Sequence, residues 1–150
     1  MFKVCEEVFD LEIKPESSES AWHEDVELWS LWEKGGEQLA YFYLDLYPRE
    51  GKYTHAAVFD ISSGGSVRQE LPVCSMVANF PNPNRGDGLM TFDEVETLFH
   101  EFGHVLHNGI GKSKYTRFVG ANCEWDFVEA PSQIMEHWVW KVACLKKISR

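Results

Sequence analysis

The chain has 150 residues, a formal net charge of −10 at pH 7 and a hydrophobic content of 44%, which is ordinary for a globular protein. This length predicts a single domain that buries about two-thirds of its unfolded surface. The negative charge argues against nucleic acid or an anionic membrane surface as a partner, and the sequence has no apolar run of about 18 residues that could span a membrane.

The N-terminal residues and the cysteines favour a cytoplasmic location. Residues 1–7 have neither the apolar core of a signal peptide nor the acid-poor, Arg-rich character of a transit peptide. The cysteines are widely spaced and form no Cys-x-x-Cys pair, so we expect reduced thiols: Cys5, Cys74, Cys123 and Cys144. We therefore expect a cytoplasmic protein, or an organellar one if a longer precursor exists.

The first half of the chain predicts one helix and a small sheet. Apolar residues near helical spacing predict a helix over residues 1–14. Three stretches of alternating or continuous apolar residues predict strands over 38–47, 55–61 and 73–80. Strands followed by helices indicate an α+β fold.

A longer helix should begin after Thr91. Thr91 and Glu94 have the form of a capping box. Apolar residues then recur at helical spacing as one stripe: Val95, Leu98, Phe99, Phe102, Val105 and Leu106. The run from Asn108 to Gly111 contains two glycines and should end the helix.

This helix carries His-Glu-Phe-Gly-His at residues 100–104. Two imidazoles one helical turn apart can bind one Zn²⁺, and the carboxylate of Glu101 can take a proton from a water. At about 100° per residue, His100 and His104 lie roughly opposite the centre of the apolar stripe. The motif fixes only three positions and occurs by chance in about one of a few hundred chains of this length, so its surroundings must decide.

His107 lies on the same face as the two histidines of the motif. It could be a third ligand, a substrate contact or a surface histidine. Spacing argues against ligation, because zincins that take a third histidine from this segment place it about six residues past the second, where Ile110 stands here. We keep His107 as a candidate substrate contact and expect the third ligand elsewhere.

Residues 124–133 contain three carboxylates and the expected start of a second helix. Pro131 fits a helix only near its start. Glu129 then lies in the first turn and shares a face with Gln133 and Glu136. Spacing favours Glu129 as the third ligand but leaves Glu124 and Asp126 open, and a capping box formed by Asp126 and Glu129 is an alternative that needs no metal.

Other residues are candidates for supporting roles. We expect His55, Ala56 and Ala57 on a strand beside a zinc cleft, where the small alanine side chains would let a substrate backbone pair with the strand edge. Tight packing of this strand against a helix is the alternative. Two carboxylates could orient the metal ligands. They are Glu96, one turn before His100, and Asp126, near Glu129.

Four stretches together resemble the M3 metallopeptidases, the family of the thimet oligopeptidases. They are residues 22–26, 41–53 followed by 55–57, 95–104 and 126–133. The resemblance assigns the two zinc histidines to His100 and His104, the catalytic glutamate to Glu101 and the third zinc ligand to Glu129, with one Zn²⁺ per chain.

The resemblance also implies a fold and an activity. The fold is an α+β, zincin-like (gluzincin) catalytic core, in which a small β-sheet packs beside an active-site helix and a second, ligand-bearing helix. The activity is that of a zinc metalloendopeptidase that hydrolyses short oligopeptides by means of a zinc-activated water.

Members of the M3 family are several times longer than this chain. Their helical segment beyond the third ligand carries tyrosines and a histidine that stabilise the transition state, and no position before Arg150 matches them. We therefore expect residues 1–150 to form a single, partial M3 catalytic domain. The alternative is a truncated, catalytically weak or inactive fragment that binds zinc or peptides.

Overall fold

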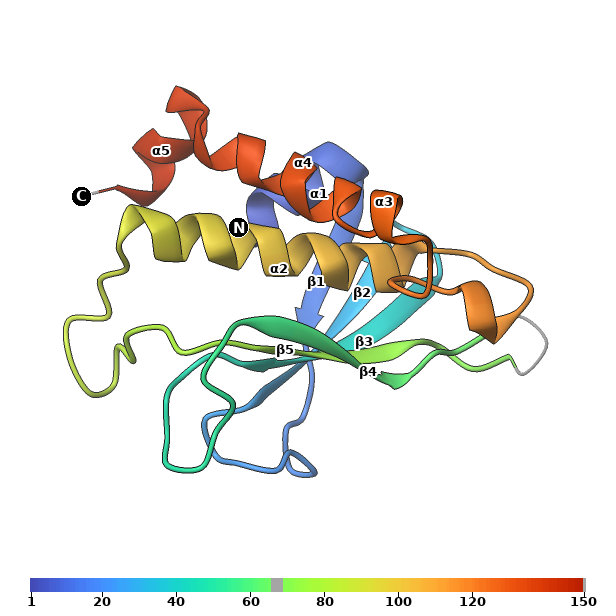
Figure 1. The fold of residues 1–150 in the computed structure, drawn as a ribbon, viewed down its shortest axis with the longest axis horizontal. Helices are drawn as coiled ribbons and strands as arrows, with labels where there is room; N and C mark the ends of the chain where they lie inside the picture. The colour runs from blue at the N-terminus through green and yellow to red at the C-terminus, as the bar shows by residue number, and fades with distance from the viewer. Residues whose placement is uncertain (66–68, 150) are drawn as a thin grey trace.

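A computed structural model describes residues 1–65 and 69–149, which form a five-stranded sheet and a set of helices (Figure 1). The helices are α1 (Phe2–Phe9), α2 (Phe92–Ile110), α3 (Trp125–Val128), α4 (Ala130–Val139) and α5 (Val142–Ile148), with a 3₁₀ turn at Thr116–Phe118. The strands are β1 (Leu11–Pro15), β2 (Glu27–Glu33), β3 (Gln38–Asp45), β4 (Ala57–Ser62) and β5 (Val73–Val77). Among the described residues, no helix combines the length and the hydrophobicity needed to cross a bilayer.

The strands run in the order β1-β2-β3-β5-β4. Strands β3 and β5 are parallel, and the other neighbouring pairs are antiparallel. This order leaves β4 at an edge of the sheet. In Figure 1, α2 crosses one face of the sheet and lies between it and the helices α3 and α4.

The core lies between α2 and the sheet. Phe99 and Phe102 of α2 are buried, and the Phe102 ring packs edge-on against Phe42 of β3 with centroids 5.4 Å apart. Each such side chain stabilises the fold by about 1.5–3 kcal/mol. The predicted capping box is confirmed: Thr91 Oγ1 accepts from the Glu94 N–H, and the Thr91 N–H donates to the Glu94 carboxylate. Helix α2 thus begins where the sequence predicts and holds its apolar stripe against the sheet.

Helix α2 ends within the predicted run, with Gly111 as its C-cap residue. The helix continues through Gly109 to Ile110. A Cβ on Gly109 would lie 2.8 Å from Leu31 Cδ2 and 3.1 Å from the Ala40 side chain, so this glycine lets the helix approach the sheet rather than ending it.

The predicted helix over residues 1–14 is too long. Asp10 adopts a left-handed conformation with φ of 57°, and its N–H donates to the Glu6 carbonyl, so α1 ends at Phe9. Residues Leu11–Pro15 instead form β1 and pair with β2. Aspartate tolerates this backbone conformation better than most residues do, which allows the sharp change of direction.

Strand β2 is absent from the sequence predictions, and the other strand boundaries differ. Residues 27–33 have no clean alternation because both faces are covered: Leu31 is buried on one side and Ser30 on the other. Strand β4 begins at Ala57, so His55 and Ala56 precede it. Strands β3 and β5 end at Asp45 and Val77, before residues 47 and 80.

Candidate metal centre

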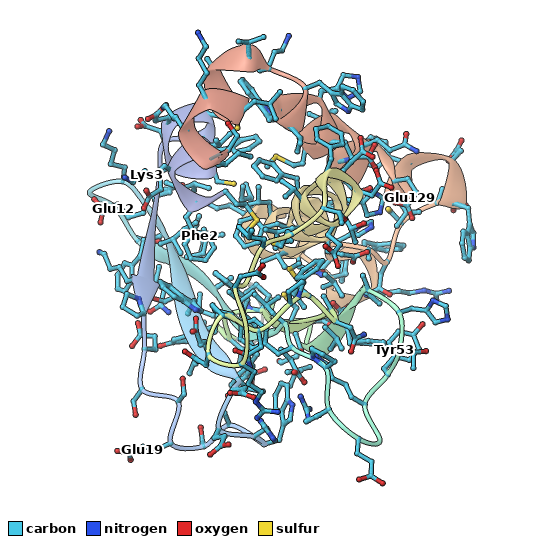
Figure 2. All side chains as sticks on the ribbon, turned by 90° about the vertical axis from the view of Figure 1, so that its left-hand side faces the viewer. Phe2, Lys3, Glu12, Glu19, Tyr53 and Glu129 are labelled. Atoms are coloured by element: carbon cyan, nitrogen blue, oxygen red, sulfur yellow. The ribbon has the colours of Figure 1, made fainter. Side chains whose placement is uncertain are left out.

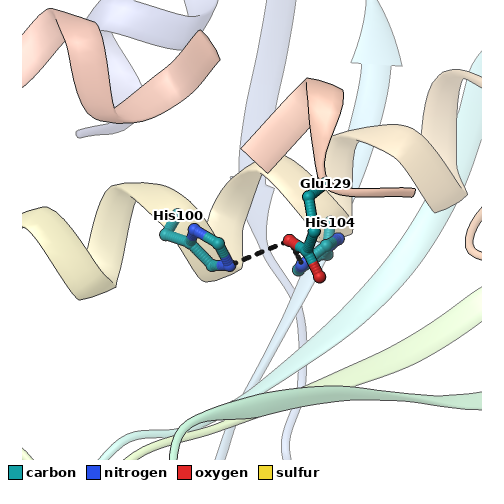
Figure 3. Close-up of side chains that lie close together, drawn as sticks. All are labelled: His100, His104 and Glu129. Atoms are coloured by element: carbon teal, nitrogen blue, oxygen red, sulfur yellow. Dashed lines mark ion pairs between the residues drawn. The ribbon is translucent and has the colours of Figure 1, made fainter. Parts of the chain in front are cut away.

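Three side chains from distant parts of the chain converge at one point. His100 and His104 lie on α2, and Glu129 lies at the break between α3 and α4. The Nε2 atoms of both histidines are 3.2 Å from Glu129 Oε2 (Figure 3). Within the part of the chain that the structure describes, these three residues form the group that offers a metal one ligand atom from each member.

Helix α4 reaches this position because Gly103 has no side chain. A Cβ on Gly103 would lie 2.5 Å from the Ser132 Cα and 2.8 Å from the Pro131 carbonyl oxygen. The glycine in the middle of the motif therefore lets the backbones of α2 and α4 touch. This contact sets the distance between the two histidines and Glu129.

Ser132 holds the Glu129 carboxylate in place. Its side chain is fully buried, and its hydroxyl oxygen lies 2.7 Å from Glu129 Oε2 and 2.9 Å from the Glu129 carbonyl oxygen. The hydrogen bond from Ser132 lowers the pKa of Glu129, and the nearby charges of His104 and His100 lower it further. The carboxylate is therefore ionised at neutral pH and restricted in orientation.

The protonation states suit a metal. Burial lowers the pKa of His104, although the Glu129 carboxylate opposes this shift. Neutral imidazole and ionised carboxylate are the forms that bind a metal. In a tetrahedral zinc site with bonds of about 2.0–2.1 Å, neighbouring ligand atoms lie about 3.3 Å apart. The two 3.2 Å contacts agree with that spacing, so the residues fit a zinc ion.

Glu101 lies beside these ligands. Its side chain is only 7% exposed, and Oε2 is buried without a hydrogen-bond partner among the described residues. Burial raises the pKa of Glu101; the charge of His100 opposes the shift, and that of Glu129 adds to it. A carboxylate with a raised pKa and a free oxygen is suited to accept a proton from a bound water.

Glu136 of α4 contacts the outer nitrogen of His100. Its Oε1 is 2.6 Å from His100 Nδ1. When the carboxylate is ionised, Nδ1–H is the donor, so a neutral ring keeps a lone pair on Nε2 and turns it toward Glu129. Sequence reasoning missed this role of Glu136. The available signal was its position seven residues after Glu129, on the same helical face.

The structure places the two predicted orienting carboxylates elsewhere. Glu96 accepts a hydrogen bond from Trp140 Nε1 at 2.7 Å. Side chains on a helix tilt toward its N-terminus, so Glu96 extends away from His100. Asp126 is exposed on α3, whereas the hydrogen bond to the Glu129 carboxylate comes from Ser132.

We expect Glu136→Ala to weaken zinc binding by about 10–100-fold, the usual effect of losing an outer hydrogen bond to a ligand. Chelator competition with a fluorescent zinc indicator measures the change. Glu96→Ala is the matched control, because it also removes a glutamate side chain, one turn before His100, but one that does not contact the imidazole. It should change the zinc affinity by less than about twofold. Equal effects of the two substitutions would contradict the assignment.

A cleft of about 490 Å³ opens in front of the three ligands. It is lined by His100, Glu101, His104, Glu129, Ala56, Ala57, Val58, Ala121, Asn122, Cys123, Trp125 and Val128. Ala56 and Ala57 thus lie at the cleft. Cys123 is exposed and also lines the cleft.

His55 and His107 do not line this cleft. His55 is exposed, and its ring lies 5.6 Å from the ring of Tyr53. His107 packs against the Phe127 ring and lines a separate apolar groove with Pro131 and Met135. Three residues correspond to a rotation of about 300°, so His107 is offset from His104 by about 60°, which places it under the start of α4. The structure therefore places neither histidine at the cleft beside the metal ligands.

A mixed sheet beside a helix that carries His-Glu-x-x-His, with a carboxylate supplied by a second helix, is typical of zincin-like metallopeptidases. The sequence matches the family described as Peptidase family M3 over residues 1–150. The chain belongs to peptidase family M3, and the resemblance found in its sequence is confirmed.

Three similar proteins illustrate the relationship. The chain is 40% identical to "Thimet-like oligopeptidase" of Dictyostelium discoideum over 156 residues, which cover 99% of the chain and 23% of that protein. It is 37% identical to "Oligopeptidase A" of Escherichia coli (strain K12), covering 99% and 23%, and 37% identical to "Organellar oligopeptidase A, chloroplastic/mitochondrial" of Arabidopsis thaliana, covering 100% and 20%. The chain therefore spans about a fifth of the length of these relatives. An organellar name among them means that family membership does not decide the compartment.

Proposed function

We propose that residues 1–150 form a zinc-dependent catalytic core that hydrolyses peptide bonds in short oligopeptides. The observation that carries the proposal is the convergence of His100, His104 and Glu129 beside the buried carboxylate of Glu101, whose Oε2 has no hydrogen-bond partner among the described residues. Membership of family M3 and the names of the oligopeptidase relatives support the peptide as substrate.

His100, His104 and Glu129 would hold the zinc ion, which supplies Lewis acidity to a water and to the scissile carbonyl. Glu101 takes the proton from the attacking water and passes it to the leaving amine. Ser132 and Glu136 keep Glu129 and His100 in the orientations described above. The burial of Glu101 keeps its pKa high enough for a base that must also release the proton.

The start of β4 is the surface that would receive the substrate. Ala56 and Ala57 line the cleft, and β4 is an edge strand whose backbone can pair with an extended peptide. Methyl side chains let a second backbone approach closely. We therefore propose Ala56 and Ala57, but not His55 or His107, as substrate contacts.

A second candidate function is zinc and peptide binding with little turnover. The described residues that line the cleft include no tyrosine, lysine or arginine that could stabilise an oxyanion beside Glu101. Loss of one oxyanion donor reduces the rate by about 10²–10³-fold. This composition favours slow hydrolysis by the isolated chain.

Cleavage of a quenched fluorescent peptide by the purified chain tests the proposal. We expect slow cleavage with one equivalent of zinc, none after removal of the metal with a chelator, and recovery when zinc is added back. A zinc-loaded chain that binds the peptide without cleaving it supports the second candidate instead. A chain that binds no zinc contradicts both.

A further inference from the structure

Residues 46–56 connect β3 to β4 and lead directly into the cleft. This connection hangs below the sheet in Figure 1 and ends at Ala56, the residue before β4. Tyr53, near its end, lies on the same flank of the molecule as Glu129 in Figure 2. The position of the proposed substrate edge therefore depends on what holds this connection.

Lys52, a residue of the β3–β4 connection with a buried side chain, holds this connection in place. Its side chain is only 3% exposed, and Nζ lies 2.8 Å from the Asp45 carbonyl oxygen and 2.7 Å from the Tyr47 carbonyl oxygen. The amine also donates to the Ala78 carbonyl and lies 2.9 Å from Asp45 Oδ1. These partners belong to the end of β3, the start of the connection and the residue after β5. One buried ammonium group thus joins three segments.

Asp45 completes the cluster. Its carboxylate is almost fully buried and accepts two hydrogen bonds from Arg49, at 2.6 and 2.8 Å, and one from Trp22 Nε1 at 2.9 Å. Burial alone would raise the pKa of Asp45, but the hydrogen bonds from Arg49, Trp22 and Lys52 outweigh it and hold the value at about 2. The buried charges are therefore paired, as a stable cluster requires.

A second hydrogen bond links the end of the β3–β4 connection to the segment that follows β5. Asn79 Nδ2 donates to the Tyr53 carbonyl oxygen at 3.0 Å. Ala57 pairs with Val77, the last residue of β5, so the anchoring residues Ala78 and Asn79, which follow β5, are close to the first residue of β4. Movement at residues 52 and 53 would be transmitted to Ala56 and Ala57 over a few bonds.

We propose that Lys52, with Asn79, positions the substrate-binding edge of the cleft by fixing the β3–β4 connection against the end of β5. The inference rests on the proposed function, because it assigns Lys52 to the peptide-binding step of that site. Lys52 does not touch the metal ligands; it is a positioning residue that should affect peptide affinity and leave zinc affinity unchanged.

The test uses the full chain with Glu101→Gln as the parent, so that peptide is bound but not cleaved. Titration calorimetry measures the binding of an unstructured octapeptide to the zinc-loaded protein, and chelator competition measures zinc affinity. We expect Lys52→Met to weaken peptide binding about tenfold or more, because small displacements at a site have effects of up to about 10²-fold. Zinc affinity should stay within about twofold of the parent.

Asn79→Ala is the second variant, since Lys52→Met leaves a buried carboxylate with one partner fewer and can unfold the chain. Removal of its single hydrogen bond should weaken peptide binding about threefold to tenfold. Lys34→Met is the matched control, because Lys34 is an exposed lysine that pairs with the exposed Asp10 and should have no effect.

Folded Lys52→Met and Asn79→Ala variants that bind the peptide as tightly as the parent would overturn the role of Lys52 and leave the proposed function intact. An equal loss of zinc and peptide affinity would also overturn it, because the effect would then be general. A parent that binds no peptide with zinc present overturns the proposed function itself, and with it this inference.

Discussion

Gly103→Ala should disrupt the zinc site although it changes none of the three metal-binding residues. The new methyl group would meet the Ser132 Cα at 2.5 Å and the Pro131 carbonyl oxygen at 2.8 Å, and both are backbone atoms that cannot rotate away. Helix α4 must move outward, and Glu129 and Ser132 move with it. A displacement of about 1 Å at a preorganised site can reduce its function about 10²-fold, so we expect zinc affinity to fall at least that much.

The expected change in stability separates this effect from helix propensity. Alanine in place of glycine stabilises a helix interior by about 1 kcal/mol, whereas overpacking a contact destabilises by about 1–3 kcal/mol. We therefore expect a modest net loss of stability in urea unfolding, together with the large loss of zinc affinity.

Gly109→Ala provides the control on the same helix. Its methyl group would meet Leu31 Cδ2 at 2.8 Å, the end of a side chain that can adjust, on the face of α2 that is turned toward the sheet. It should reduce stability without weakening zinc binding. Wild-type zinc affinity in Gly103→Ala would contradict the explanation of how Glu129 reaches the histidines.

Glu101→Gln should separate zinc binding from hydrolysis. The amide has nearly the same shape as the carboxylate, so the cleft and the three ligands stay intact, but it cannot accept a proton from water. General-base catalysis contributes about 10²–10⁴ to the rate, so cleavage should fall by about 10³-fold or to background. Zinc affinity, measured in parallel, should remain within about threefold of wild type, because Glu101 is not assigned as a ligand.

The pH dependence of cleavage by the wild-type chain should also reflect the ionisation of Glu101. The base works only when ionised, and burial raises the pKa of Glu101. Activity should therefore be lost as the pH falls through that raised pKa, at a higher pH than for an exposed glutamate. A Glu101→Gln variant that cleaves at the wild-type rate would contradict the role of Glu101.

Much of the metal centre could be predicted from local sequence. The capping box at Thr91, the apolar stripe and the spacing of His100 and His104 depend on residues within one helix, and the structure agrees with them. The approach of Glu129 depends on a contact between two helices. The family resemblance singled out Glu129, but the parts of Gly103 and Ser132 in that contact were visible only in three dimensions.

The predictions that the structure does not support also concern contacts between elements that are distant in the sequence. Glu96 was predicted to orient His100 because it lies one turn before it, yet α4 brings Glu136 to the imidazole across 36 residues. Strand β2 was missed because residues on both of its faces, Ser30 and Leu31, are buried and the sequence lacks a clean alternating pattern. His107 shares a helix with the ligands, but the start of α4 directs it into a different groove.

The most direct test of the metal centre is zinc K-edge X-ray absorption on the chain loaded with one equivalent of zinc. We expect two imidazole nitrogens and oxygen neighbours, with no sulfur, and a stoichiometry of one zinc per chain. A sulfur neighbour would assign Cys123, which lines the same cleft, in place of one of the three ligands. That result, or the absence of stoichiometric zinc, would contradict a site built from His100, His104 and Glu129.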